Sequence, residues 1–114
     1  MKSMSARQSK VANEVQHIVA LALVQGRIPS TLPLTRITVM ECWISADLRV
    51  ARAYLQVPAE LNTPEFFADA NAQLAKAMRK ILANGLATKY TPDISFWPAE
   101  TEISYPAPQK DIIK

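Results

Sequence analysis

The residues of this sequence that are best placed to do chemistry are its lysines and arginines. Lys76, Arg79 and Lys80 lie within about one turn of a predicted helix, and no aspartate or glutamate occurs in residues 70–92, which also contain Lys89. Clustered cations of this kind bind the phosphates of nucleic acids and release their condensed counterions. The same cluster also suits a solvated helix face that keeps a protein soluble. The spacing alone leaves both interpretations open.

Catalytic and metal chemistry have little support in the sequence. The chain has one histidine, His17, among polar residues of a predicted helix, and one cysteine, Cys42, in an apolar segment. A cysteine nucleophile needs a neighbouring base, and a zinc site needs several such ligands. With only Gly26 and Gly85, the chain has neither a glycine-rich phosphate loop nor the GxxG loop of ordinary KH domains. We therefore expect a protein that is not an enzyme and that uses no cofactor or metal ion.

Length and composition indicate one folded domain. The chain has 114 residues, of which 49% are hydrophobic and 20% charged, with a formal net charge of +3. These values are typical of globular proteins, and a mildly basic domain is compatible with a nucleic-acid partner. The longest apolar run, residues 18–24, is too short to span a bilayer, and the start MKSMSARQSK lacks the apolar core of a secretory signal. We expect a cytoplasmic location.

Hydrophobic periodicity and capping signals predict the elements that position these residues. Ser5 and Gly26 have the residue types of a helix N-cap and C-cap, and Thr63 with Pro64 is a typical helix start. The four residues SADL, 45–48, favour an antiparallel hairpin between two strands. In chain order, the predicted elements are a helix over 6–25, a loop at 27–33, strands at 35–44 and 49–57, a helix from 64 towards 82, and a strand at 93–97.

This order predicts an α+β domain with helices on one face of a small three-stranded sheet. We assign residues 1–98 to the domain and residues 99–114 to an irregular C-terminal tail, since three prolines occur from Pro98 onward. The second helix is expected to break or bend before Pro92, at Ala83-Asn84-Gly85.

Alternation along the strands divides their side chains between two faces of the sheet. The helix-facing side is predicted to carry Ala51, Ala53, Leu55 and Val57, and Cys42 is placed in the core together with Met40 and Ile44. The open side is predicted to carry Trp43, Arg52, Tyr54 and Trp97. This open side is either a stacking platform for unpaired bases or a surface that the tail covers with Ile103 and Tyr105.

Arg49 stands beside the hairpin turn. We expect it to brace the turn through a local ion pair with Asp47, which contributes little if it is exposed. Arg52, on the open side, is the better candidate for contact with a partner.

Two segments resemble a known protein family. "ISADLRVARAYLQV", with its core Ser45-x-Asp47-Leu48-Arg49-x-Ala51, resembles the hairpin of bacterial ribosome-binding factor A. "KYTPDISFW", residues 89–97, resembles the segment that leads into the last strand of that family. The resemblance covers about residues 5–98.

The resemblance implies a type II KH-like fold, in the order helix, strand, strand, helix, kink, helix, strand. It also implies a protein that binds the free small ribosomal subunit, assists its late maturation and supports processing of its 16S rRNA. We expect this protein to be a monomer. The family bends its long helix at Ala-x-Gly, where this chain has Leu74-Ala75-Lys76, so the kink is expected to be absent, weak or moved to residues 83–85. The candidate rRNA-binding residues are Arg7, Lys10, Arg52, Lys76, Arg79, Lys80 and Lys89.

A different class of function is also compatible with the sequence. The chain would then be a protein-interaction adaptor that binds a peptide or a second copy through its aromatic sheet face, with no RNA role. Binding that is insensitive to salt would distinguish an adaptor from an rRNA-binding factor.

Overall fold

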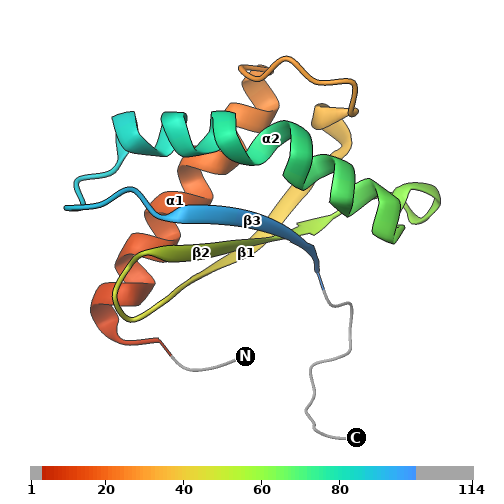
Figure 1. Cartoon of the computed structure of the whole chain (residues 1–114). Coiled ribbons are helices and arrows are strands. Elements are labelled where there is room, and N and C mark those ends of the chain that lie inside the picture. Colours follow the sequence, from red (N-terminus) through yellow and green to blue (C-terminus); the bar gives the residue numbers. More distant parts are fainter. Residues whose placement is uncertain (1–3, 100–114) are drawn as a thin grey trace, which may run out of the picture.

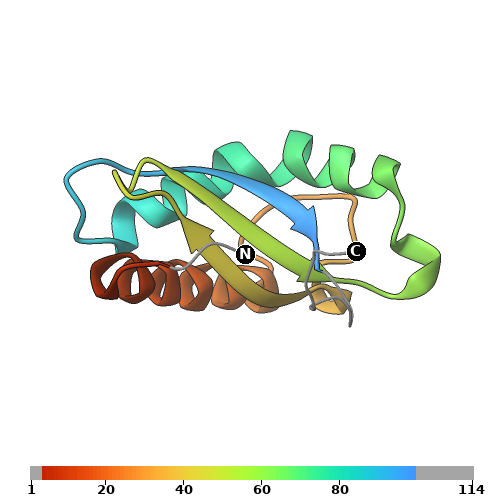
Figure 2. The ribbon, with the colours of Figure 1, turned by 90° about the horizontal axis from the view of Figure 1, so that it is seen from below.

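Two helices cover one face of a three-stranded sheet in the computed structural model, which describes residues 4–99 (Figure 1). Figure 2, seen from below, looks onto the strands with both helices behind them. The elements are α1 (Ala6–Gln25), the short 3-10 helix η1 (Leu34–Arg36), β1 (Thr38–Ile44), β2 (Val50–Gln56), a second short 3-10 helix η2 (Ala59–Leu61), α2 (Pro64–Gly85) and β3 (Asp93–Pro98). The predicted fold class and element order are confirmed. The division between domain and tail stays a prediction, because residues 100–114, with Ile103 and Tyr105, lie outside the described part.

The caps of α1 are those that the sequence predicts. The Ser5 hydroxyl accepts a hydrogen bond from the Gln8 backbone N–H at 3.1 Å, and the Gln8 side chain accepts one from the Ser5 N–H at 2.9 Å. This reciprocal pair satisfies two backbone donors at the start of the helix. Gly26 ends the helix with φ of 63°, a left-handed conformation that favours glycine.

The sheet has the order β1-β2-β3, with β1 antiparallel to β2 and β2 parallel to β3. The predicted hairpin is therefore confirmed. Helix α2 makes the crossover that a parallel pair requires, and it lies on the same face as α1 (Figure 1). Strand β3 is left at an edge of the sheet.

The start of β1 differs from the prediction. The strand predicted from Thr35 begins at Thr38, because residues 34–36 form η1 instead. The Arg36 N–H donates to the Pro33 carbonyl and the Ile37 N–H donates to the Leu34 carbonyl, at 2.9 and 3.2 Å. These local bonds use the backbone groups that a strand would need for its neighbour.

A β-bulge in β1 changes the side of the sheet to which one residue belongs. The pairing with β2 shifts between Val39 and Glu41, so that Met40 is an extra residue in the strand. Val39 is buried and Met40 is 49% exposed, whereas Cys42 and Ile44 are buried. The assignment of Cys42 and Ile44 to the core is confirmed, and that of Met40 is wrong.

Helix α2 runs without interruption from Pro64 to Gly85, capped by the Thr63 hydroxyl. The kink that the resemblance implies is absent from it. Leu74, Ala75 and Lys76 are good helix formers, and Leu74 is fully buried, so nothing at that point favours a bend. Gly85 instead lies close to α1, since a Cβ atom there would stand 2.9 Å from Cδ1 of Ile18.

The core fills the space between the helices and the covered face of the sheet. Ala51 and Ala53 are fully buried, and their small side chains let the helices approach β2 closely. Phe96 of β3 and Met78 of α2 are among the largest side chains that the core buries, and no charged side chain is buried among residues 4–99. None of the helices in this part of the chain has the length and apolar character needed to cross a bilayer.

Candidate nucleic-acid interface

All seven predicted rRNA-binding residues are exposed. The C-terminal half of α2 carries Lys76, Arg79 and Lys80, and the loop that follows carries Lys89. Arg79 Nη1 lies 3.2 Å from Asp93 Oδ1, and both side chains are more than half exposed. Because an exposed pair of this kind contributes about 0–1 kcal/mol, Arg79 can exchange Asp93 for another anion at little cost.

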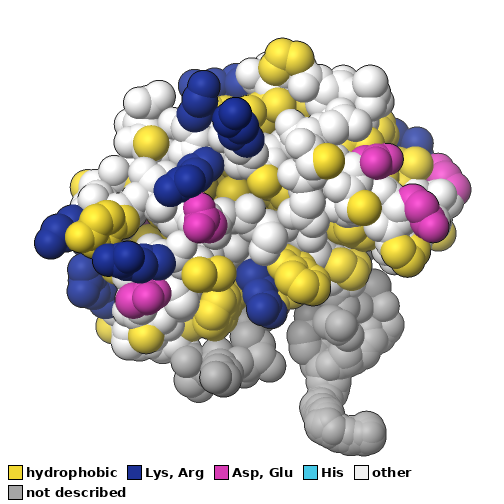
Figure 3. Space-filling view, in the orientation of Figure 1, with side chains coloured by type: hydrophobic (Ala, Val, Ile, Leu, Met, Phe, Trp, Pro, Cys, Tyr) yellow, Lys and Arg dark blue, Asp and Glu magenta, His cyan; other side chains and the backbone are white. Residues whose placement is uncertain are grey.

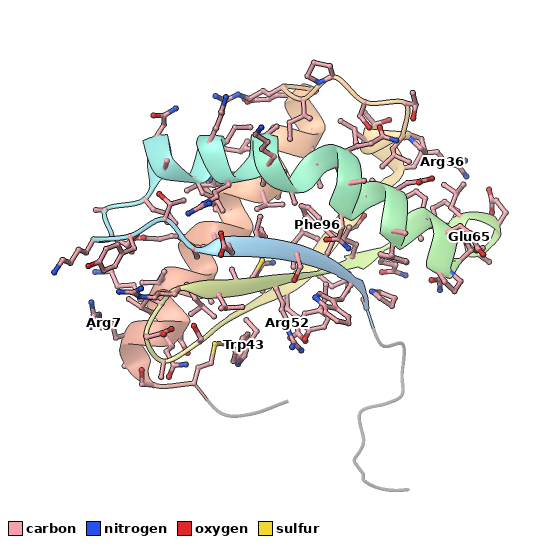
Figure 4. All side chains as sticks on the ribbon, viewed as in Figure 1. Arg7, Arg36, Trp43, Arg52, Glu65 and Phe96 are labelled. Atoms are coloured by element: carbon pink, nitrogen blue, oxygen red, sulfur yellow. The ribbon has the colours of Figure 1, made fainter. Side chains whose placement is uncertain are left out.

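The first turn of α1 lies close to the β1–β2 turn. The Gln8 side chain donates to the Ile44 backbone carbonyl at 2.9 Å, which fixes the helix start beside the end of β1. Arg7, labelled in Figure 4, and Lys10 are exposed on this part of α1. In Figures 1 and 2 the end of α2, the α2–β3 loop, the β1–β2 turn and the start of α1 all lie on one side of the molecule.

We call this side the basic end; it comprises Arg7, Lys10, Arg49, Lys76, Arg79, Lys80 and Lys89. Figure 3 shows Lys and Arg side chains concentrated over it and over the C-terminal half of α2. The acids Glu60, Glu65 and Asp69 belong to η2 and the first half of α2, and Figure 3 shows Asp and Glu side chains at that opposite end. Within α2, the acids thus occupy the first half and the basic side chains the second half.

The β1–β2 turn uses its acid for local bonds. Asp47 Oδ1 accepts hydrogen bonds from the Ser45 hydroxyl at 2.6 Å and from the Arg49 backbone N–H at 3.1 Å. These two bonds hold the pKa of the Asp47 carboxyl below its ordinary value. Leu48 has φ of 62°, a left-handed conformation that is strained for a residue other than glycine. Its side chain is buried and anchors the turn in the core.

The predicted ion pair between Arg49 and Asp47 is not among the ion pairs of residues 4–99. The Arg49 guanidinium lies over the ring of Tyr90 instead, 4.2 Å from its centroid, and Lys89 Nζ lies 5.4 Å from the same centroid. No pattern in the sequence predicts a role for Tyr90. The only signal was the adjacent lysine and tyrosine of "KYTP", which does not reveal the contact with an arginine 41 positions earlier.

The open face brings three of its predicted members into contact. The Arg52 guanidinium lies 4.8 Å from the ring centroid of Trp97 and 5.6 Å from that of Trp43. The Trp97 indole N–H donates to the Ser95 hydroxyl at 2.8 Å, which fixes the orientation of the ring. Trp97 is 42% exposed, whereas Trp43 and Tyr54 are half-buried. The prediction that these side chains share the open face is confirmed, and Figure 4 shows Trp43 and Arg52 below the sheet.

The residues weighed for catalysis occupy different environments. His17 is exposed on α1, and Cys42 is buried in β1. Burial, with a smaller effect of the neighbouring Glu41 carboxylate, raises the pKa of the Cys42 thiol to about 12. A thiol of this kind is unreactive at neutral pH. No group of three or more potential metal ligands occurs in the part of the chain that the structure describes.

A cleft of about 510 Å³ lies at the other end of the sheet, between the start of α2 and the end of β3. Its lining includes Phe67, Asn71, Phe96 and Pro98, none of which titrates. The Asn71 carboxamide is engaged there, because it accepts from the Phe96 N–H and donates to the Phe96 carbonyl, at 2.8 and 3.0 Å. No pattern in the sequence predicts this cleft.

Comparison with known proteins identifies the relatives of the chain. The family model described as ribosome-binding factor A matches residues 7–105. A ribosome-binding factor A of Pelodictyon phaeoclathratiforme is 36% identical over 98 residues, covering 82% of this chain and 77% of that protein. The chain belongs to the ribosome-binding factor A family.

Structures of ribosome-binding factor A share this fold. A Thermotoga maritima protein assigned to ribosome binding factor A, solved by NMR, has a TM-score of 0.64 at 25% identity, covering 91% of this chain and 97% of that one. A Thermus thermophilus ribosome binding factor A, fitted as a homology model into a cryo-EM map of a 30S complex, has a TM-score of 0.56. The two sequences are 16% identical, and the match covers 89% of this chain and 100% of the Thermus thermophilus chain. The likeness therefore concerns the fold alone. The predicted family is confirmed.

Proposed function

We propose that this ribosome-binding factor A family protein associates with the free small ribosomal subunit, assists its late maturation and supports processing of 16S rRNA. It acts by binding, as a cytoplasmic monomer, and catalyses no reaction. The observation that carries the proposal is the exposed basic end, built around a stretch of the chain without acids, in a family named for ribosome binding. The Thermus thermophilus relative fitted into a map of a 30S complex supports the choice of subunit.

The basic end suits rRNA because its cations come from several elements and are exposed, so that phosphates can approach them. Lys76 and Lys80 are one turn apart on α2, and Lys89 extends the same charge into the next loop. The carboxylates of Asp47 and Asp93 offset only part of this charge, because the basic end comprises seven cations and Arg79 can exchange Asp93 for a phosphate at little cost. We assign the rRNA contacts to Arg7, Lys10, Arg52, Lys76, Arg79, Lys80 and Lys89.

The proposal is tested by binding of purified small subunits across a salt series. If Lys76, Arg79 and Lys80 each contact a phosphate, they contribute roughly −2 to −3 to the slope of log K against log salt, at about 0.7 to 0.9 per contact. Replacing all three with glutamine removes this contribution and leaves the fold intact, since glutamine is a good helix former. Arg36→Gln is the control, because Arg36 pairs with Glu60 at the acidic end and lies outside the basic end.

Two results would contradict the proposal. The first is a wild-type protein that stays at the top of a sucrose gradient, away from free small subunits, even at low salt. The second is a deletion strain with normal 16S rRNA ends and normal amounts of free subunits. A folded triple variant with unchanged affinity and slope would remove only the three α2 residues from the interface.

The adaptor hypothesis has one specific observation in its favour. Met40, Val50 and Trp97 are apolar or aromatic side chains that are 49%, 44% and 42% exposed. A surface of this kind can bind a protein. Binding to a protein partner that raised salt does not weaken, together with no association with ribosomal subunits, would favour the adaptor over the assembly factor.

A further inference from the structure

We infer that the open face of the sheet is a stacking site for unpaired nucleobases, formed by Trp43, Arg52 and Trp97. This inference rests on the proposed function and extends it, because it adds a contact with bases to the contacts with phosphates at the basic end. The ligand class is single-stranded RNA with accessible bases.

Strand register places these side chains next to one another. Trp43, Arg52 and Ser95 are cross-strand partners and form one row across β1, β2 and β3. Glu41, Tyr54 and Trp97 form the adjacent row. Neighbouring strands lie about 4.8 Å apart, so the two rows together present a continuous surface of three aromatic rings around one guanidinium.

The surface is held in place before a ligand binds. The Ser95 hydroxyl fixes the indole N–H of Trp97, and the Arg52 guanidinium lies over the same ring. A base that stacks on Trp97 therefore does not have to order that ring first, which lowers the cost of binding. Both Arg52 and Trp97 remain exposed.

The charges favour a base over a phosphate backbone or an acidic peptide on this face. Arg52 supplies one cation to attract an anionic strand, whereas Glu41 stands in the next row and repels a dense line of phosphates. Base stacking on aromatic rings and on guanidinium planes needs no further positive charge. Phosphates of the same RNA molecule can reach Arg49 and Lys89. Arg49 lies three residues before Arg52, about 10 Å along the extended polypeptide.

Cation–π contacts are concentrated on the open face of the sheet and in the cluster next to it. Residues 4–99 contain four such pairs, two of which share Arg52 and two of which share Tyr90. All four pairs involve either the open face or the adjoining cluster of Arg49, Lys89 and Tyr90. Basic side chains interleaved with aromatic rings are the usual composition of surfaces that bind single-stranded nucleic acids.

Intrinsic fluorescence gives a direct test, because Trp43 and Trp97 are the only tryptophans in the chain. The full chain is titrated with an unstructured octamer of adenosine and, in parallel, with an abasic octamer that has the same phosphates. We expect the adenosine octamer to quench the emission and to bind about tenfold more tightly than the abasic one. Trp97→Ala should weaken binding of the adenosine octamer about tenfold and leave binding of the abasic octamer unchanged.

Leu21→Ala is the matched control, because Leu21 of α1 is 42% exposed, as Trp97 is, and lies away from the sheet. Trp97→Phe keeps an aromatic ring but loses the hydrogen bond to Ser95, so it should give an intermediate loss of affinity for the adenosine octamer. This variant replaces Trp97→Ala in the test if the alanine variant is poorly folded. The Lys76, Arg79 and Lys80 glutamine variant should lose part of its salt dependence and keep the difference between the two octamers.

The outcomes separate this inference from the proposed function. Normal subunit binding with equal affinity for the two octamers, or with no effect of Trp97→Ala, would overturn the stacking site and leave the proposed function intact. Emission that changes with protein concentration or with an added peptide, and not with the adenosine octamer, would assign the open face to a protein partner instead. Base-dependent quenching by a protein that does not bind subunits would support the stacking site and contradict the proposed function.

Discussion

The two faces of one sheet follow different physical rules in this protein. On the covered face, Ala51, Ala53 and Leu55 of β2 are at most 1% exposed, and they belong to a buried cluster of hydrophobic residues. On the open face, Arg52 and Tyr54 of the same strand are exposed or half-buried, and they lie among tryptophans. Successive residues of one strand thus serve different purposes, because their side chains alternate between the faces.

Folding restricts the residue types on the covered face of the sheet, whereas residues of the open face can serve partner binding. A charge or a large side chain on the covered face conflicts with the close approach of the helices, so folding alone restricts the residues there. On the open face, an arginine and two tryptophans contribute little to the core, and a structural requirement does not explain them. Residues of this second kind are the ones to examine for partner binding.

The largest effect is expected from placing a charge on the covered face. Ala53→Asp buries a carboxylate among apolar side chains at a fully buried position, and it should lower the free energy of unfolding by at least about 3 kcal/mol. Gln56→Asp introduces the same group at an exposed position of the same strand and should change stability by less than about 0.5 kcal/mol. Chemical denaturation of both variants measures the difference.

Equal losses of stability in the two variants would break the comparison. That result would mean that the strand tolerates an acid equally badly on either side, independently of which face the helices cover. An unchanged melting temperature for Ala53→Asp would show that the two faces are assigned the wrong way round.

Features of the fold that depend on local pattern could be predicted from the sequence. The caps at Ser5, Gly26 and Thr63, the hairpin and the alternation along β2 all follow from residues close together in the chain. The features that were missed depend on contacts between distant segments. The bulge at Met40 is set by pairing with β2, and the Arg49–Tyr90 contact joins a hairpin turn to a loop beyond α2.

The candidate site shows the same division. Sequence periodicity predicts that Lys76, Arg79 and Lys80 share the exposed side of one helix, and the structure places them there. Strand alternation predicts that Trp43, Arg52 and Trp97 share a face, which the register confirms. The pairing of Arg79 with Asp93 depends on how α2 lies over β3, and alternation or helical period carries no information about it.

The next prediction concerns the outer edge of the sheet, at β3, where a side chain stands in for a neighbouring strand. The Asn71 carboxamide binds the N–H and the carbonyl of Phe96, as a neighbouring strand would, and also donates to the Phe67 carbonyl at 2.9 Å. Asn71→Ala leaves these partly buried backbone groups without a partner and should lower stability by about 1–3 kcal/mol. Thermal or chemical unfolding measures the loss.

Asn84→Ala is the control for this change. Asn84 is exposed near the end of the same helix, so its replacement reports only the higher helix propensity of alanine, up to about 0.7 kcal/mol in favour of folding. If Asn71→Ala is as stable as Asn84→Ala, the carboxamide is not a substitute for a missing strand, and the edge of β3 needs no such partner. A stable Asn71→Ala variant that dimerises would instead indicate that the exposed edge has paired with a second copy.

The smallest predicted effect concerns the buried thiol of the covered face. Burial raises the pKa of Cys42 from 9.0 to about 12, so between these values the native state keeps a proton that the unfolded state has lost. Raising the pH through this window therefore favours the unfolded state, and below about pH 9 the thiol gives no pH dependence. The slope of the loss approaches a limit of roughly 1.4 kcal/mol per pH unit, and the loss accumulated by pH 10 is about 1.4 kcal/mol.

Unfolding free energies at pH 8, 9 and 10 for wild type and Cys42→Ala isolate this contribution, because the two proteins differ in no other titratable group. We expect the alanine variant to be less stable at pH 8, through the cavity it creates, and to lose less stability as the pH rises. If the two proteins instead lose stability in parallel as the pH rises, water reaches the thiol, and the covered face is more hydrated than the burial of its side chains indicates.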